Sequence, residues 1–208
     1  MSRYIVNMIM AGAVYILLYR GIKRGLIIKS RGITAGVVIM LSAGMFLFDS
    51  STMAVWSLLV FQSYMDITER QVFSVLTYFM IAVQAVHCIV YCLIYTPVLP
   101  AHTLLFPTIL VTGMSVAGAY AAGDAEIFLM IMLHSYSRGI RPDIYMTALI
   151  FLSLVIFAVY TGFVNLARVL RHEATVQRAA FVPAITWGYF MLALFGNITE
   201  VNSVHLNA

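Results

Sequence analysis

Apolar runs, each bounded by charged residues, proline or glycine, repeat along almost the whole chain. A helix needs about 20 residues to cross a hydrocarbon core of roughly 30 Å, and several of the runs approach that length. Only Asp49, Ser50 and Ser51 separate the second run from the third, which predicts a tight hairpin or a partly re-entrant pair. The pattern predicts eight helices, at residues 4–19, 33–48, 52–66, 74–95, 103–122, 125–137, 143–166 and 180–196.

The composition indicates that lipid is the solvent of this chain. Of its 208 residues, 62% are apolar and 10% are charged, which leaves too little polar surface for a soluble fold of this size. We therefore expect an all-α polytopic membrane bundle of about eight transmembrane helices, forming one integral membrane domain over residues 1–208. The net charge of +4 gathers beside the apolar runs. This placement predicts a lipid bilayer partner and no nucleic acid.

Lysine and arginine in short loops predict the orientation in the membrane. With eight alternating crossings, Arg3, Arg138 and Arg141 fall on one face. Nine basic residues fall on the other face: Arg20, Lys23, Arg24, Lys29, Arg31, Arg70, Arg168, Arg171 and Arg178. The face with nine is predicted to be cytoplasmic, with both chain termini outside.

Several residues that often carry chemistry have structural interpretations here. Cys88 and Cys92, one helical turn apart beside His87, are interpreted as packing residues because no fourth metal ligand lies near them in the sequence. No metal or organic cofactor is predicted. Asp49 is expected to cap the helix that follows it, and His134 is expected at the membrane interface. Four glycines are interpreted as sites of helix packing: Gly12, Gly36, Gly44 and Gly113.

Two aspartates at helix ends are more informative as a pair. Asp66 ends the third apolar run, and Asp124 follows Gly123 and opens the sixth. Taken singly, Asp66 is equally well explained as a solvated helix terminus and Asp124 as a helix cap. The 58 residues from one to the other hold two apolar runs and an outer turn. A helical hairpin of that kind returns the chain to the same face, so both carboxyl groups are able to meet.

Two adjacent carboxyl groups are the requirement of aspartyl proteolysis. One of them, as a carboxylate, takes a proton from the attacking water, while the other, as an acid, hydrogen-bonds the scissile carbonyl. Two like charges at that distance cannot both ionise cheaply, so the pair titrates as a unit. Gly123 allows the backbone to turn tightly or to pack closely beside Asp124.

The sequence around Asp66 resembles the first aspartate motif of the type IV prepilin peptidases. In that motif an Ile or Val follows the Asp by six residues and a Pro usually comes next. Residues 63–72 read SYMDITERQV, so Val72 fits the motif and Phe73 stands in the place of the Pro.

The sequence around Asp124 resembles the second motif of the same family, Gly-x-Gly-Asp-x-Lys. Residues 118–126 read GAYAAGDAE, in which Gly123 and Asp124 match. Ala121 stands for the first Gly and Glu126 stands for the Lys. A basic loop before a last apolar helix also resembles the end of the family's chains, so the prepilin-peptidase-like region extends over residues 50–196.

The resemblance implies a membrane aspartyl endopeptidase that removes the basic leader of prepilins or pseudopilins at the cytoplasmic face of a bacterial or archaeal inner membrane. Asp66 and Asp124 match the family's catalytic pair, with Val72 and Gly123 as supporting positions. Many members also methylate the new pilin terminus and carry a tetra-cysteine zinc domain. The loop over residues 20–31 has no cysteine. We therefore expect a short form without the zinc module, and methylation stays open.

Two further carboxylates lie within three residues of the aspartate pair. Glu69 and Glu126 are either possible leader-binding residues, through attraction of the leader's Lys or Arg, or merely solvated helix ends. Two other functions stay open for the chain as a whole. In an ion- or proton-coupled transporter, Asp66 and Asp124 would be coupling sites along an aqueous path. A non-catalytic membrane assembly factor would need neither aspartate.

Overall fold

The computed structural model describes residues 2–25, 31–94, 99–100, 102–119, 121–172, 174 and 179–206. The side chains of Ser2, Arg31 and residues 196–206 are outside this description, as are Lys29 and Arg178 of the predicted basic face. The described residues form eight α-helices and no strand. The helices are α1 (Ser2–Lys23), α2 (Arg31–Leu47), α3 (Ser50–Glu69), α4 (Ser74–Ile94), α5 (His102–Val116), α6 (Ala122–Ser137), α7 (Pro142–Leu170) and α8 (Val182–Leu206).

The all-α class and the eight predicted helices are confirmed, but two predicted boundaries are wrong by more than a few residues. The last helix was expected to end at residue 196, whereas α8 continues to Leu206. The fifth helix was expected to run to residue 122, but α5 ends at Val116. Gly118 has a φ of 74°, and the N–H of Ala119 donates to the carbonyl of Met114 at 2.9 Å. This arrangement is a Schellman stop signal, which glycine provides because it adopts a left-handed conformation without a steric penalty.

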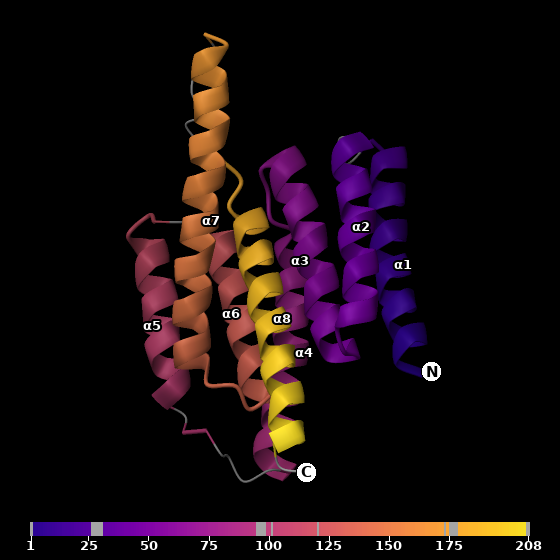
Figure 1. The fold of residues 1–208 in the computed structure, drawn as a ribbon, viewed down its shortest axis with the longest axis vertical. Coiled ribbons are helices and arrows are strands. Elements are labelled where there is room, and N and C mark those ends of the chain that lie inside the picture. The colour runs from indigo at the N-terminus through magenta and orange to yellow at the C-terminus, as the bar shows by residue number, and fades with distance from the viewer. Residues whose placement is uncertain are drawn as a thin grey trace.

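Successive helices run up and down, so the chain forms an antiparallel bundle (Figure 1). α3 packs against α1, α2 and α8, and α6 packs against α4, α5 and α7. Almost every residue of α3 between Thr52 and Met65 is buried, and α6 buries nine of its residues. These two helices therefore form the interior of the bundle, and the other helices surround them.

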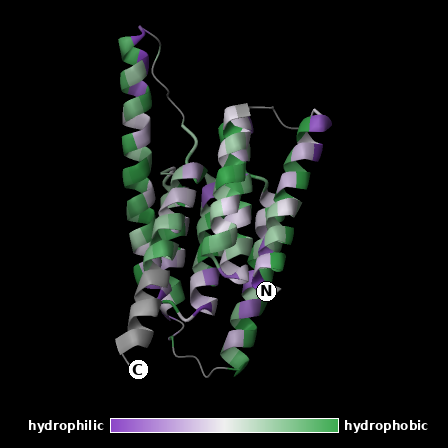
Figure 2. Ribbon diagram, turned by 45° about the vertical axis from the view of Figure 1, so that its right-hand side comes forward, coloured by the Kyte–Doolittle hydropathy of each residue, from purple (hydrophilic) through white to green (hydrophobic). Residues whose placement is uncertain are grey.

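The surrounding helices include the three that are long and apolar enough to cross a membrane: Arg3–Lys23, Ser74–Ile94 and Pro142–Leu170. Their side chains are mostly exposed in the isolated chain, as expected for surfaces that face lipid. Figure 2 shows hydrophobic residues along much of the length of these helices. The described part of the chain therefore carries the basic features of a membrane protein.

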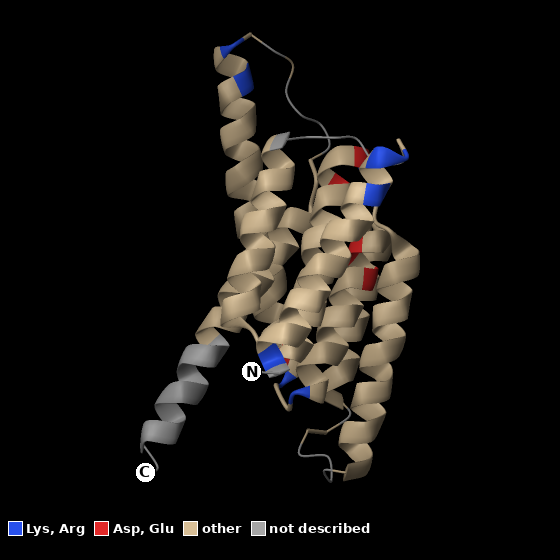
Figure 3. Ribbon diagram, turned by 90° about the vertical axis from the view of Figure 1, so that its right-hand side faces the viewer, with Lys and Arg blue, Asp and Glu red and all other residues tan. Residues whose placement is uncertain are grey.

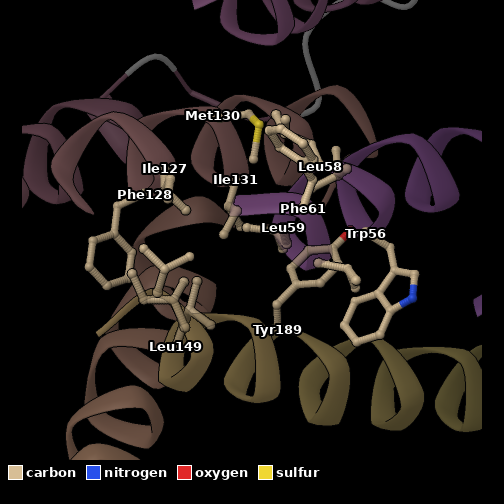
Figure 4. Close-up of a cluster of buried hydrophobic side chains, with 14 of the residues drawn as sticks. Trp56, Leu58, Leu59, Phe61, Ile127, Phe128, Met130, Ile131, Leu149 and Tyr189 are labelled. Atoms are coloured by element: carbon tan, nitrogen blue, oxygen red, sulfur yellow. The ribbon is translucent and has the colours of Figure 1, made fainter. Parts of the chain in front are cut away.

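The core lies between α3, α6, α7 and α8, and it is filled by aromatic and aliphatic side chains (Figure 4). The Trp56 indole packs 5.1 Å from the Phe190 ring and 5.5 Å from the Phe48 ring, measured between centroids. Its Nε1–H donates to the carbonyl of Met40 at 2.9 Å. Trp56 is therefore held on several sides, and its indole N–H has a partner, as a buried tryptophan requires.

Charged residues gather toward the two ends of the bundle (Figure 3). At the end where α1 begins, Arg3 donates to the carbonyl of Phe46 at 3.3 Å, and Arg138 forms an ion pair with Asp49. Asp49 also accepts the N–H of Thr52 at 2.9 Å, so its predicted role as the cap of α3 is confirmed.

The glycine predictions were correct at one position and wrong at three. A Cβ added to Gly44 would overlap the indole of Trp56, so this glycine permits close packing of α2 on α3. A Cβ at Gly12, Gly36 or Gly113 would meet nothing within 4 Å. Small size alone does not identify a packing site, because the residue must also face a neighbouring helix.

Replacing Gly44 by Ala is expected to destabilise the protein by about 1–3 kcal/mol, the usual effect of overpacking a filled core. Gly36→Ala, on the same helix, is the matched control. It should be neutral or stabilising by up to about 1 kcal/mol, because alanine favours helix and space is open there. Thermal unfolding of both variants in detergent measures the difference. Equal stability of the two variants would contradict the packing described for Trp56.

Candidate active site

Asp66 lies in the last turn of α3, where it caps a different helix. Its Oδ2 accepts the backbone N–H of Val182, the first residue of α8, at 3.0 Å. A carboxylate at this position is stabilised by the partial positive charge of the helix N-terminus. One turn earlier, the hydroxyls of Ser63 and Thr186 lie 2.7 Å apart and also join α3 to α8. Asp66 is half-buried and is not the fully solvated helix end that the sequence left open.

Asp124 lies in the first turn of α6 and is 6% exposed. Its Oδ2 accepts the backbone N–H of Ala121 at 3.0 Å, which closes the turn that begins the helix. The expected capping role is therefore present, although Asp124 is the third residue of the helix and not the residue before it. The carboxyl group of Asp124 is therefore buried, close to one end of the bundle.

The two sequence motifs meet where Gly123 packs on Val72. A Cβ added to Gly123 would lie 2.8 Å from the Cβ of Val72, closer than two such atoms approach. Only glycine therefore allows the start of α6 to lie this near the segment that follows α3. The two supporting positions expected from the sequence, one in each motif, are thus in direct contact.

Gln62 fixes the segment that carries Val72. Its side chain is fully buried, and its Nε2 donates to the carbonyl of Phe73 and to Oγ1 of Thr77, both at 2.9 Å. Its Oε1 accepts the N–H of Phe73 at 2.7 Å. A proline, the usual residue at this place in the motif, has no N–H and would lose that last bond. The departure from the motif at Phe73 therefore has a structural reason.

Burial is the main influence on the acidity of the two aspartates, which lie outside the three long apolar helices. Burial raises the pKa of Asp124 to about 6, the N–H of Ala121 lowers it, and the negative charge of Asp66 raises it. Burial also raises the pKa of Asp66, while the N–H of Val182 and the positive charge of Arg70 act in the opposite direction. The charge of Asp66 therefore contributes to the raised pKa of Asp124, although burial is the larger cause.

The two glutamates near the pair have different surroundings. Glu126 accepts the hydroxyl of Tyr78 on α4 at 2.7 Å through Oε1, and its Oε2 is buried without a hydrogen-bond partner among the described residues. Glu69 is the last residue of α3, and its side chain or backbone also takes part in a polar interaction. Nothing in the sequence identified Tyr78, Gln62 or Val182 as partners in the site.

The other candidate residues lie away from the aspartate pair. Cys88 donates to the carbonyl of Leu133, and Cys92 lies 3.8 Å from the hydroxyl of Tyr136, so both pack between α4 and α6. His134 was expected at the membrane interface, but this prediction was wrong. Its ring is buried 6.3 Å from the ring of Tyr189, because α6 lies inside the bundle. No three His, Cys, Asp or Glu side chains converge as a metal site within the described ranges.

The chain matches no protein family, no curated protein and no solved structure at a significant level. The resemblance to the prepilin peptidases therefore rests on the two short motifs. What the geometry adds is the contact of Gly123 with Val72 and the electrostatic coupling of Asp66 with Asp124.

The pKa of Asp124 should fall when Asp66 is replaced by Asn, because the neighbouring negative charge is lost. It should remain above the ordinary value of about 4, since burial is the largest cause of the shift. Labelling of Asp124 by dicyclohexylcarbodiimide, which attacks protonated carboxyls, should decline as pH rises through about 6 in the unchanged protein and at lower pH in Asp66→Asn.

The pH series is read by mass spectrometry of the Asp124 peptide. Asp143→Asn is the matched control, because Asp143 pairs with Arg141 at the start of α7, beyond the other end of α6. It should leave the labelling midpoint unchanged. A midpoint at about 4 in the unchanged protein would contradict the effect of burial on Asp124. A midpoint that Asp66→Asn does not move would show that the charge of Asp66 does not act on Asp124.

Proposed function

We propose that this chain is a membrane aspartyl endopeptidase that removes the basic leader from type IV prepilins or pseudopilins. The observation that carries the proposal is the contact of Gly123 with Val72, which joins the two aspartate motifs. The effect of the Asp66 charge on the pKa of Asp124 supports the same conclusion. Two coupled carboxyl groups at one end of a membrane bundle are the arrangement that this hydrolysis requires.

The environments of the two carboxyl groups favour different roles. Asp124 is the better acid, because its burial favours the neutral form, and it would donate a hydrogen bond to the scissile carbonyl. Asp66 is the better base, since the N–H of Val182 and the charge of Arg70 stabilise its anion. Asp66 takes a proton from water as the water oxygen bonds to the carbonyl carbon. That proton then passes to the leaving nitrogen as the peptide bond breaks, so no metal or organic cofactor is needed.

The proposed arrangement in the membrane has eight crossings, with both termini outside and the aspartates at the cytoplasmic face. The distribution of basic residues supports this orientation. Arg20 and Lys23 lie in the last turn of α1 and Arg24 follows it, while Arg168 and Arg171 lie at the end of α7. These loops lie at the same end of the bundle as the end of α3 and the start of α6, which is the end predicted to be cytoplasmic (Figure 1).

The substrate would approach Asp66 from the lipid. An apolar hollow of ≈ 230 Å³ lies between α2, α3 and α8, and Ser63, Tyr64 and Ile67 on both sides of Asp66 help to line it. The hydrophobic helix that follows a prepilin leader would place its side chains there. The basic leader would remain at the surface, where Glu69 and Glu126 are proposed to attract it.

The positions of the aspartates favour the peptidase over the ion- or proton-coupled transporter. Coupling sites of transporters usually lie near the bilayer midplane, on interrupted helices. Asp66 is instead three residues from the end of α3, and Asp124 is the third residue of α6. Neither helix is interrupted at its aspartate.

Replacing Asp66 or Asp124 by Asn should each abolish leader cleavage, because an amide supplies neither the base nor the acid. The double variant should be no slower than either single variant, since residues that act as a unit are not additive. The measurement is release of the leader from a prepilin in reconstituted membranes. Asp143→Asn, a matched loss of one carboxylate elsewhere, should cleave at the normal rate.

Both single variants should accumulate in the membrane and should unfold at a temperature close to that of the unchanged protein. The unfolding temperature of each variant in detergent checks this. Substantial cleavage by either Asp66→Asn or Asp124→Asn would disprove the aspartyl mechanism. Normal cleavage by both would leave the two residues with their capping roles alone.

A further inference from the structure

Two hollows lie side by side where the end of α3, the second half of α7 and the start of α8 meet. The first, called the head hollow here, has a volume of ≈ 140 Å³ and is lined by Arg70 and Arg168. The second, called the chain groove, has a volume of ≈ 460 Å³. The two share Ile67, Tyr160 and Ala180, so one opens onto the other.

The linings of the two hollows differ in chemistry. In the head hollow, the guanidinium groups of Arg70 and Arg168 are the charged groups, and both side chains are exposed. Arg168 donates one N–H to the carbonyl of Ala174 at 3.2 Å. A guanidinium has five donors in a planar fork, so most of its capacity for binding an anion is kept. The chain groove is lined by apolar and aromatic side chains, among them Phe157, Trp187 and Met191.

The depth of the hollows matches the boundary between headgroups and hydrocarbon. At 1.5 Å per residue, the 29 residues of α7 extend about 44 Å, which exceeds a hydrocarbon core of about 30 Å. α7 also extends beyond its neighbours at the end that carries Arg168 (Figure 1). The last turns of α7 therefore reach headgroup level, while Phe157 and Trp187 lie deeper.

We propose that the head hollow and the chain groove together bind one anionic phospholipid. The phosphate lies between Arg70 and Arg168, and an acyl chain lies along the groove against Trp187. A basic prepilin leader is excluded by charge, because both cationic groups would repel it. A free phosphate would fill only the head hollow, whereas the continuity with an apolar groove favours an amphipathic molecule. This inference does not depend on the proposed peptidase activity.

The two tryptophans of the chain provide the probe. Trp187 is 45% exposed and lines the groove, whereas Trp56 is 1% exposed in the core. The protein is reconstituted in phosphatidylcholine nanodiscs that contain a small fraction of phosphatidylglycerol with brominated acyl chains, which quench nearby tryptophan. Brominated phosphatidylcholine in the same amount is the neutral comparison.

Brominated phosphatidylglycerol should quench Trp187 at a mole fraction roughly 25-fold lower than brominated phosphatidylcholine does. Each arginine should contribute about fivefold to this preference, so Arg70→Gln with Arg168→Gln should abolish it. Arg24→Gln with Arg171→Gln removes two cations from the same end of the bundle but outside the head hollow, and should keep most of the preference. Trp187→Phe should remove the quenching itself.

Two further arms distinguish a bound lipid from a free anion that occupies the head hollow alone. Ala180→Phe blocks the junction of the hollows and keeps both arginines, so it should lower the preference even if the arginine variant does not fold. Inorganic phosphate should not reverse the quenching beyond the effect of sodium chloride at equal ionic strength.

Equal quenching by the two brominated lipids would overturn the proposal. A preference for phosphatidylglycerol that survives in Arg70→Gln with Arg168→Gln would also overturn it. Equal loss of the preference in Arg24→Gln with Arg171→Gln would indicate an effect of general surface charge and would overturn it as well. Reversal by inorganic phosphate alone would show a free anion site in place of a lipid site.

Discussion

The close approach of Gly123 to Val72 is the constraint on which the candidate site depends. Because glycine has no Cβ, the start of α6 lies against the segment after α3, although α6 packs chiefly on α4, α5 and α7. Gln62 holds that segment in place from the core by binding the N–H and the carbonyl of Phe73. The result brings the charge of Asp66 within reach of the carboxyl group of Asp124.

The arrangement of the helices also accounts for the polar side chains buried inside this apolar protein. Among the described residues, α3 and α6 hold seven of the thirteen buried polar side chains: Thr52, Ser57, Gln62, Ser63, Asp124, His134 and Ser135. Unpaired polar groups are costly in a medium without water, so polar side chains are better placed in the interior, where neighbours supply partners for Thr52, Gln62 and Ser63. The three helices that are long and apolar enough to cross a membrane, α1, α4 and α7, lie around α3 and α6. The site therefore lies on the two helices that are best shielded from lipid.

Both aspartates have structural duties, since Asp66 caps α8 and Asp124 closes the first turn of α6. Capping and catalysis are compatible, because a carboxylate held by a backbone N–H has a fixed orientation. The cost is that replacement of either residue removes a cap worth about 1 kcal/mol. The unfolding temperature is therefore a necessary companion to any activity measured on these variants.

Much of the fold could be predicted from the sequence, because the apolar runs and their boundaries follow from the spacing of charged residues, proline and glycine. The position of Asp66 and Asp124 at the same end of the bundle followed from the helical hairpin between them. The contacts that position the pair did not follow, since Gln62 and Tyr78 carry no sequence signal of a partner far along the chain. The burial of His134 was also missed, because local polarity does not show which helix lies at the centre.

The most direct test of the account is whether residues 66 and 124 share one site in the folded protein. The test places Asp66→Cys and Asp124→Cys together in a background of Cys88→Ser and Cys92→Ser, and treats the protein in membranes with a short bifunctional thiol reagent. The account predicts rapid cross-linking within one chain, and none for the control pair Asp66→Cys with Asp143→Cys, whose residues lie at opposite ends of the bundle. Failure of the first pair to cross-link in a protein that unfolds at the normal temperature would contradict it.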